Sequence, residues 1–171
     1  MTAADWLTAL ILALVTLERL GELALARRNT RALLAAGAQE FAAGHYPLIV
    51  LLHAAWLSGL WILAWGRPVI LPLLAIFLVL QMLRLWVLAT LGKRWTTRII
   101  VIPGEPLVRR GPYRILSHPN YAVVAGEIAC LPLVFALTWY ALIFSVANAL
   151  MLTLRIRAEN RALRSANAPA G

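Results

Sequence analysis

Long apolar runs, separated by short segments that carry basic residues and prolines, make up most of this chain of 171 residues. A helix needs about 20 consecutive apolar residues to cross the hydrocarbon core of a bilayer, and several of the runs approach that length. The runs predict five spanning helices, over residues 6–26, 47–65, 69–91, 121–137 and 139–154, the last continuing as a polar helix to about residue 163. We therefore expect an all-α, polytopic membrane protein with a single domain over residues 1–171.

The balance of apolar and charged residues supports a membrane location. Hydrophobic residues make up 62% of the chain and charged residues 13%, with a mean hydropathy of +0.79. A soluble domain has about a quarter of its residues charged, so a soluble helical bundle of this composition would lack the charge that its surface needs. Residues 1–6 contain no Lys or Arg, so the first apolar run predicts a retained helix and not a cleaved signal peptide.

The net charge of +9 arises from short clusters of Lys and Arg between the apolar runs, and not from a separate basic domain. This distribution argues against nucleic-acid binding and is typical of a membrane protein whose basic loops face the cytoplasm. In the five-helix topology, thirteen of the sixteen basic residues fall on one side, namely Arg27, Arg28, Arg31, Lys93, Arg94, Arg98, Arg109, Arg110, Arg114, Arg155, Arg157, Arg161 and Arg164. We expect that side to be cytoplasmic, with the N-terminus outside and the C-terminus inside.

The longest segment outside the apolar runs covers residues 92–120 and lies on the predicted cytoplasmic side. It contains Pro-Gly, Gly-Pro and His-Pro pairs near residues 103, 111 and 118, and such pairs form turns. It also contains apolar stretches at 99–102 and 107–108, which a flexible linker would lack. We predict that this segment folds back against the membrane domain and roofs a pocket.

Several ionisable or polar side chains interrupt the apolar runs. A charge at mid-bilayer costs on the order of 3 kcal/mol, so such groups usually pair with one another or line a cavity. Glu18 and Glu22 are four residues apart and share one helix face. In one interpretation they neutralise Arg84 or Arg19 between helices; in the other, Glu18, Glu22 and Arg84 bind a substrate. Gln81 and Glu127 are further polar residues within the runs.

Two other features allow a structural and a functional interpretation. His45, at the start of the second run, is either a hydrogen-bonded interface residue or a base or hydrogen-bond partner for a substrate. Arg155 and Glu159 stand four residues apart, so they form either a surface ion pair or a pair that holds a charged or zwitterionic ligand. The single cysteine, Cys130, and the lack of Cys/His clusters predict no metal site. No Gly-rich loop follows a strand pattern, which excludes a Rossmann-type nucleotide site.

Two motifs resemble those of the isoprenylcysteine carboxyl methyltransferase family. That family has a Gly-x-Tyr stretch followed by Arg-His-Pro-x-Tyr, and further on Arg-x-x-x-Glu-Glu-x-x-Leu. Residues 111–113 and 118–121 match the first stretch, and residues 155–163 match the second. The similarity extends over about residues 91–163. Two positions depart from the pattern, because Ser117 replaces an Arg and Asn160 replaces the second Glu.

The resemblance implies a methyltransferase whose cofactor is S-adenosylmethionine. It places the cofactor-binding part at about residues 91–163 and implies that Arg155 and Glu159 are catalytic. The cofactor-binding residues that it implies are Val108, Gly111, Pro112, Tyr113, His118, Pro119, Asn120, Tyr121 and Glu159. The polar cofactor would come from the cytoplasm, and a lipid-like acceptor would come from the bilayer.

The first half of the chain resembles a bacterial branch of that family, associated with type III polyketide synthases. The resemblance lies in residues 18–23 and 27–29, in Glu40, in His45-Tyr46 and in residues 92–97. It implies a bacterial inner-membrane enzyme that O-methylates an alkylresorcinol or alkylpyrone. A phenol, with a pKa of about 10, gains from a nearby base, unlike a carboxylate. The alternatives are carboxyl methylation of a prenylcysteine-like substrate, and a membrane transporter or assembly protein, although no internal repeat of the transporter kind is visible.

Overall fold

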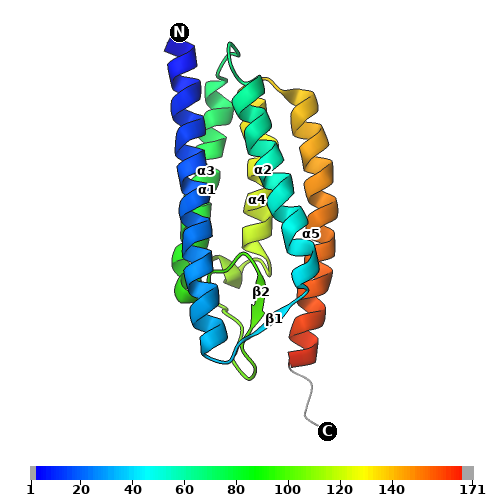
Figure 1. Ribbon diagram of the computed structural model, residues 1–171. Coiled ribbons are helices and arrows are strands. Elements are labelled where there is room, and N and C mark those ends of the chain that lie inside the picture. The colour runs from blue at the N-terminus through cyan, green and yellow to red at the C-terminus, as the bar shows by residue number, and fades with distance from the viewer. Residues whose placement is uncertain (1–2, 167–171) are drawn as a thin grey trace.

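The computed structural model describes residues 3–166 and contains five long helices that run up and down alongside one another (Figure 1). They are α1 (Ala3–Ala35), α2 (Tyr46–Leu63), α3 (Leu71–Leu91), α4 (Pro119–Val134) and α5 (Thr138–Ala166). Short 3-10 helices follow β1 and α3 and precede α4: η1 (Ala43–His45), η2 (Gly92–Arg94) and η3 (Gly111–Arg114). The connections from α1 to α2 and from α3 to α4 lie at the same end as the end of α5 (Figure 1).

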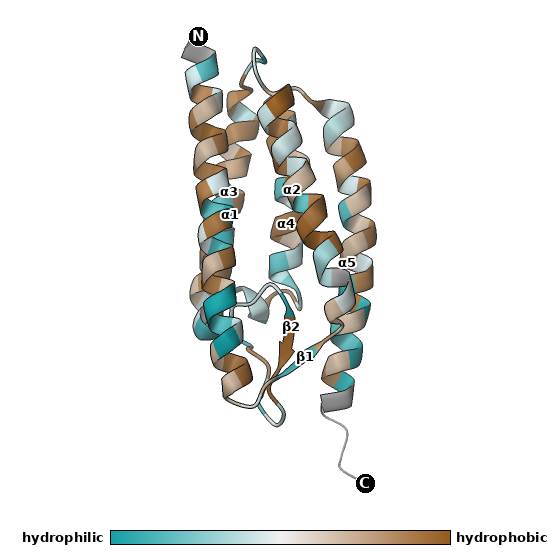
Figure 2. Cartoon of the chain, in the orientation of Figure 1, coloured by the Kyte–Doolittle hydropathy of each residue, from teal (hydrophilic) through white to brown (hydrophobic). Residues whose placement is uncertain are grey.

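The protein is an integral membrane protein built from apolar helices. Among residues 3–166, three helical stretches are long and apolar enough to cross a membrane: Tyr46–Leu63, Leu71–Arg94 and Thr138–Arg164. Helix α4 is apolar but has 16 residues, and α1 carries several charges, so the predicted total of five spans stays a prediction. Large apolar side chains point outward along the bundle, including Leu10, Leu17, Ile62, Met82 and Leu150, and apolar residues cover most of the helices (Figure 2).

The core lies where the helices meet, away from the end at which α1 connects to α2 and α3 connects to α4. Leu12, Leu60, Leu131 and Phe135 are completely buried there. The Trp56 indole donates a hydrogen bond of 3.3 Å from Nε1 to the backbone oxygen of Ile128, which ties α2 to α4. Phe77 of α3 belongs to the same buried cluster, and Tyr140 of α5 packs against it, so all five helices share one core.

The predicted helix boundaries need correction at two places. Helix α1 continues to Ala35 and not to residue 26, because good helix formers persist up to Gly37, whose positive φ of 92° ends the helix. The fourth helix covers Pro119–Val134 and not residues 121–137, since proline is favoured in the first turn of a helix. Pro132 lies in the last turn of this helix, which ends at Val134.

A small antiparallel sheet joins two distant loops and was not predicted. Strand β1 (Gln39–Phe41) pairs with β2 (Ile99–Val101), with Glu40 opposite Ile100. Ile99 and Val101 are buried and pack against Ala162 near the end of α5. Strands of three residues are too short to display the alternating pattern by which a strand is recognised in a sequence.

Candidate active site

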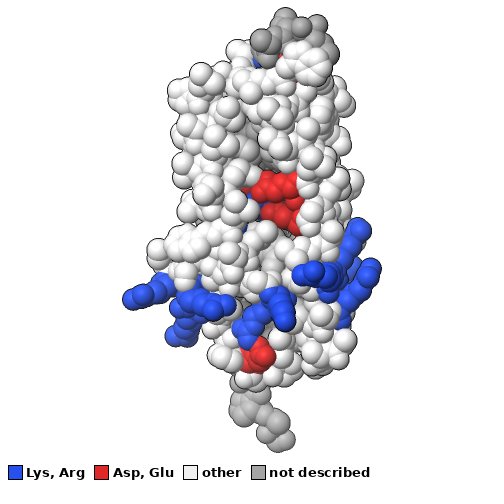
Figure 3. All heavy atoms as spheres, turned by 90° about the vertical axis from the view of Figure 1, so that its left-hand side faces the viewer, with Lys and Arg blue, Asp and Glu red and all other residues white. Residues whose placement is uncertain are grey.

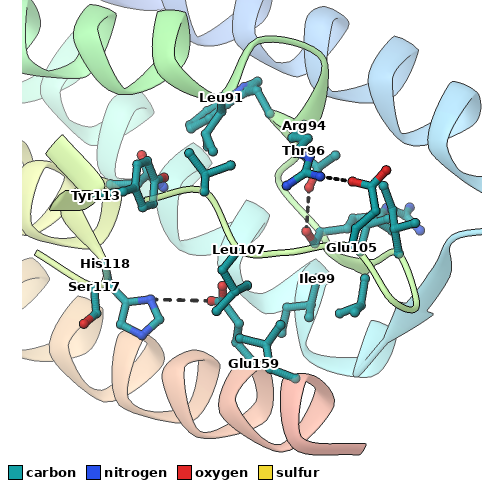
Figure 4. Close-up of a pocket in the computed structure, with 18 of the residues that line it drawn as sticks. Leu91, Arg94, Thr96, Ile99, Glu105, Leu107, Tyr113, Ser117, His118 and Glu159 are labelled. Carbon is teal, nitrogen blue, oxygen red and sulfur yellow. Dashed lines mark hydrogen bonds and ion pairs between the residues drawn. The ribbon is translucent and has the colours of Figure 1, made fainter. Parts of the chain in front are cut away.

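A cavity of about 830 Å³ lies at the end of the bundle that carries the sheet. Its walls come from the loop after α3, strand β2, residues 105–121 and the last turns of α5. In Figure 4, Tyr113 and His118 lie on one side, Arg94 and Glu105 on the other, and Leu107 between them. Ligand pockets in proteins commonly enclose about 300–1,000 Å³, so the cavity has room for a molecule of cofactor size.

The loop that follows α3 is held by residues from the first half of the chain. The buried side chain of Asn29 on α1 donates from Nδ2 to the backbone oxygens of Gly92 (3.1 Å) and Trp95 (2.9 Å). The buried Trp95 carbonyl thereby obtains a partner from outside the loop, and the Gly92 carbonyl obtains a second donor besides the Trp95 backbone N–H. Trp95, which is 2% exposed, forms part of the cavity wall.

The part of this loop next to strand β2 forms further hydrogen bonds with the first half of the chain. The Arg98 guanidinium donates from Nη1 to both carboxylate oxygens of Glu40, at 2.9 and 3.0 Å. Tyr46 Oη and Thr97 Oγ1 share a hydrogen bond of 3.0 Å. Residues 29, 40 and 46 belong to the front-half resemblance, which gave Asn29, Glu40 and Tyr46 no role. Their role here is to fix one wall of the cavity.

Four side chains from α5 and the start of α4 form a connected polar group, which we call the Tyr121 relay: Arg155, Tyr121, Glu159 and His118. Arg155 Nε donates to Tyr121 Oη over 2.8 Å, and Tyr121 Oη donates to Glu159 Oε2. His118 Nδ1 lies 3.9 Å from the same Glu159 oxygen (Figure 4), and its ring stacks on Tyr121 with centroids 5.2 Å apart. Arg155 and Glu159 are thus joined through a tyrosine hydroxyl, which the four-residue spacing alone did not reveal.

Tyr113 occupies the cavity wall near this relay. Burial and, second to it, the nearby Glu159 carboxylate raise the pKa of Tyr113 to about 12. The phenol therefore keeps its proton at neutral pH and can act as a hydrogen-bond donor toward the cavity.

Among the residues implied as cofactor ligands, six line the cavity and three do not. Val108, Tyr113, His118, Asn120, Tyr121 and Glu159 line it, as does Arg155. Pro112 and Pro119 instead line a separate apolar groove of about 240 Å³ between α3 and α4. Gly111 shapes the turn before η3: its φ is 56°, and a Cβ there would lie 2.6 Å from Thr90 Oγ1. The direct cofactor contact of these three residues therefore stays a prediction, and in the structure they lie beside the cavity and not in its lining.

Sequence reasoning missed part of the cavity. Trp95, Arg94, Arg98 and Glu105 line it although none was named as a ligand. Arg94 donates to the Pro106 backbone oxygen over 2.8 Å and forms an ion pair with Glu105, so it closes the loop on itself. Arg94 and Trp95 fall within residues 92–97, and the resemblance of that stretch to the bacterial branch was the sequence signal that could have pointed to them.

Three of the four predicted substrate-binding residues, Glu18, Glu22 and Arg84, lie in a different place, inside the bundle. Arg84 forms an ion pair with Glu22 and donates from Nη1 to Glu127 Oε2 over 2.8 Å. Glu18 accepts a hydrogen bond from Gln81. The side chain of His45 lies outside the part of the chain that the structure describes. In residues 3–166, no group of three or more His, Cys, Asp or Glu residues is arranged to hold a metal ion.

Comparisons with known proteins identify relatives of this chain. Residues 73–165 match the isoprenylcysteine carboxyl methyltransferase (ICMT) family. The chain is also 39% identical over 160 residues to the uncharacterized protein YpbQ of Bacillus subtilis (strain 168), an alignment that covers 91% of this chain and 95% of YpbQ. No solved structure matches the chain. The family match covers α3, α4 and α5 together with most of the cavity wall.

Proposed function

Because the chain belongs to the isoprenylcysteine carboxyl methyltransferase family and is thus an integral membrane methyltransferase, we propose that it transfers a methyl group from S-adenosylmethionine to a lipid-like acceptor. The acceptor atom that we propose is the phenolic oxygen of an alkylresorcinol or alkylpyrone. The observation that carries the proposal is the cavity with the Tyr121 relay in its wall, at the end of apolar helices.

The residues around the cavity fit S-adenosylmethionine. Leu91, Ile99 and Leu107 provide apolar surface for an adenine ring, and the carboxylate of Glu159 and several arginines suit a zwitterionic amino-acid end. Among the described residues, the buried Trp95 Nε1 donor and the buried Asn120 Oδ1 acceptor have no hydrogen-bond partner. A buried polar group without a partner costs about 1–3 kcal/mol, so a ligand that bonds to both would recover that free energy.

The bound cofactor would supply a methyl group on a sulfonium sulfur, with a neutral thioether as leaving group. We propose that Val108, Tyr113, His118, Asn120, Tyr121 and Glu159 hold it. Arg155 fixes the Tyr121 hydroxyl, which in turn keeps its proton directed at Glu159 Oε2. The contribution of these residues is alignment and exclusion of water, which suits a transfer that needs no acid.

The acceptor must lose a proton if it is a phenol. Glu159 is a carboxylate in the cavity wall and can take that proton, while Arg155 stabilises the developing oxyanion. A prenylcysteine-like carboxylate is the second candidate acceptor, because Arg109 and Arg114 also line the cavity and could pair with it. The departures at Ser117 and Asn160 from the family motif favour the phenol.

We also propose a location and a topology. Basic side chains gather at the end of the molecule that carries the cavity (Figure 3). Basic loops favour the cytoplasmic side, so the proposal is five spans in a bacterial inner membrane, with the N-terminus outside and the C-terminus inside. The whole chain, residues 1–171, would form one domain, with the cofactor-binding part at about residues 91–163.

The experiment that tests this function is calorimetric titration of the protein in detergent with S-adenosylhomocysteine, followed by a methyl-transfer assay. We expect saturable binding that is weakened by His118→Ala and by Tyr121→Phe. Labelled methyl groups should then pass from S-adenosylmethionine to an alkylresorcinol. Folded protein that binds no S-adenosylhomocysteine would refute the methyltransferase proposal. Transfer to a farnesylcysteine derivative but not to alkylresorcinol would refute the acceptor alone.

A further inference from the structure

A second polar group lies inside the bundle, separated from the cavity along the helices. We call it the interhelical cluster; it consists of Glu18, Arg19, Glu22, Gln81, Arg84 and Glu127. Glu127 follows Tyr121 by six residues on α4, which corresponds to a rise of about 9 Å along a helix. The cluster is therefore roughly two helical turns from the Tyr121 relay, on the side toward the middle of the bundle.

Arg84 is the centre of the interhelical cluster. Its guanidinium binds the Glu22 carboxylate from one side and donates to Glu127 Oε2 over 2.8 Å from the other. Arg19 reaches the same two carboxylates, at 3.1 Å from Glu22 Oε2 and 3.0 Å from Glu127 Oε2. Each of the two arginines therefore contacts both Glu22 and Glu127.

The cluster contains one carboxylate more than it needs for neutrality. Glu22 and Glu127 balance Arg19 and Arg84, and Glu18 is the additional acid. Glu18 lies 3.9 Å from Arg19 and 4.0 Å from Arg84, and its closest contact is the neutral amide of Gln81. With all groups ionised, two guanidiniums face three carboxylates, so the cluster carries a charge of about −1.

The cluster also contains buried polar atoms that lack hydrogen-bond partners. Among the described residues these are two acceptors, Glu127 Oε1 and Gln81 Oε1, and one donor, Arg19 Nη2. Glu127 is 2% exposed, and its other oxygen contacts both arginines, so the whole carboxyl group lies within the cluster. Two such acceptors beside one donor point to a ligand group, such as a hydroxyl, that can both donate and accept.

The cluster is open to the side of the bundle and lies behind one residue of the cavity wall. Figure 3 shows acidic side chains in a hollow of the lateral surface, above the basic end, and the Glu18 side chain is 22% exposed. The Arg84 guanidinium carbon lies 5.9 Å from the centre of the Trp95 ring, and Trp95 lines the cavity. A ligand that came from the lipid could therefore reach the cluster from the side of the bundle, with Trp95 between the cluster and the cavity.

We propose that the interhelical cluster binds the head group of the methyl acceptor and selects an uncharged head with at least two hydroxyl groups over a head with a carboxylate. This inference rests on the proposed function and specifies its acceptor. One hydroxyl donates its single proton to Glu127 Oε1 or to Gln81 Oε1, while the other, across the ring, is the one left for methylation. A carboxylate head would bring a second negative charge next to the additional Glu18 and would supply no donor.

The test measures acceptor binding directly, without cofactor, by thermophoresis of the labelled protein in detergent. The probes share one long alkyl chain and differ in the head: a resorcinol, a phenol with one hydroxyl, a benzoate and an amine. We expect the resorcinol to bind at least about tenfold more tightly than the phenol or the benzoate, since each tenfold corresponds to one good hydrogen bond to a charged group.

Variants locate the effect. At least one of Gln81→Leu and Glu127→Gln should weaken resorcinol binding about tenfold, while the affinity for S-adenosylhomocysteine stays unchanged. Glu18→Gln makes the cluster neutral and should strengthen benzoate binding several-fold. The matched control is Asp5→Asn, which removes a carboxylate from the start of α1, where it accepts a hydrogen bond from the Gly66 backbone, and should change the affinity for none of the four probes.

Three results would overturn the proposal. The first is resorcinol affinity that is unchanged in both Gln81→Leu and Glu127→Gln, with only the melting temperature lowered, because the cluster would then be structural. The second is benzoate binding as tight as resorcinol binding in the wild type. The third is an amine that binds more tightly than the resorcinol. Loss of S-adenosylhomocysteine binding in the wild type would instead refute the proposed function, and the probe measurements distinguish the two failures because they need no cofactor.

Discussion

The cavity and the interhelical cluster are two polar regions with opposite construction. Loops, a short sheet and helix ends build the cavity, and basic residues outnumber acidic ones in its wall. Three helices build the cluster, which contains more acid than base and lies in apolar surroundings. The difference matches two ligands of opposite character, a polar one that comes from water and an apolar one that comes from lipid. The enzyme therefore has to hold each ligand with a different part of its fold.

From this difference we expect ion pairs to contribute much more to the free energy of unfolding in the cluster than at the cavity. Arg84→Ala should destabilise the protein by about 3–5 kcal/mol, because removal of one partner leaves buried charges uncompensated. Glu22 and Glu127 would be those charges, since both bind Arg84. Thermal unfolding in detergent measures the loss.

Arg98→Ala provides the matched control for this prediction. Arg98 pairs with Glu40 near the cavity, and its side chain is 42% exposed. An exposed ion pair contributes about 0–1 kcal/mol, so this variant should melt close to the wild type. Equal destabilisation by the two substitutions would contradict the distinction between a buried and an exposed pair.

The second prediction concerns the chemistry at the cavity. Glu159→Gln should lower turnover about a hundredfold, because it removes a proton acceptor that also receives the Tyr121 hydroxyl. Rapid-quench measurement of methyl transfer gives the rate, and calorimetry gives the cofactor affinity. Unchanged affinity with lost turnover would support the role of base, whereas lost affinity would support a cofactor contact.

Glu105→Gln is the control for Glu159→Gln. Glu105 also lines the cavity, but it pairs with Arg94 in the loop and does not contact the Tyr121 relay. Turnover should stay within about twofold of the wild type, as a surface pair contributes little. A similar loss in both variants would show that the general electrostatics of the cavity, and not Glu159 itself, control the rate.

The sequence predicted the helices and the relay better than the contacts that join distant loops. Apolar runs identify spanning helices because such a helix needs apolar residues along its length, either to face the lipid or to pack in the core of the bundle. His118, Tyr121, Arg155 and Glu159 meet as the motifs implied, since α4 and α5 form an antiparallel hairpin. The pairing of β1 with β2 could not be predicted from the sequence, because strands of three residues are too short to show an alternating pattern of apolar and polar residues.

The interhelical cluster was predicted only in part. Glu18, Glu22 and Arg84 were recognised from their cost in an apolar run. The sharing of Glu127 by two arginines depends on how α1, α3 and α4 are rotated about their axes, and spacing within one run does not determine this rotation. The same reason explains why Asn29 was noticed but received no role.

The third prediction tests the link from α1 to the cavity wall. Asn29→Ala should destabilise the protein by about 2 kcal/mol, because the buried Trp95 carbonyl loses the Asn29 donor, although the Gly92 carbonyl keeps the Trp95 N–H. Since Trp95 lines the cavity, affinity for S-adenosylhomocysteine should also fall, while resorcinol binding at the cluster changes less. Calorimetry with both ligands separates the two regions, and equal loss for both would contradict their independence.

The last prediction has the smallest expected effect and concerns Tyr113. Burial and the Glu159 charge raise the pKa of Tyr113 to about 12, so its hydroxyl stays protonated throughout the range in which an ordinary phenol titrates. Tyr113→Phe removes one hydrogen-bond donor and should weaken cofactor affinity about fivefold, as a hydrogen bond contributes about 1 kcal/mol. The rise of the transfer rate with pH should keep its midpoint, because the titrating group is the acceptor phenol, with a pKa of about 10, or its base. A midpoint that shifts in Tyr113→Phe would mean that Tyr113 itself exchanges the proton. In that case the polar machinery of the cavity would extend beyond the Tyr121 relay.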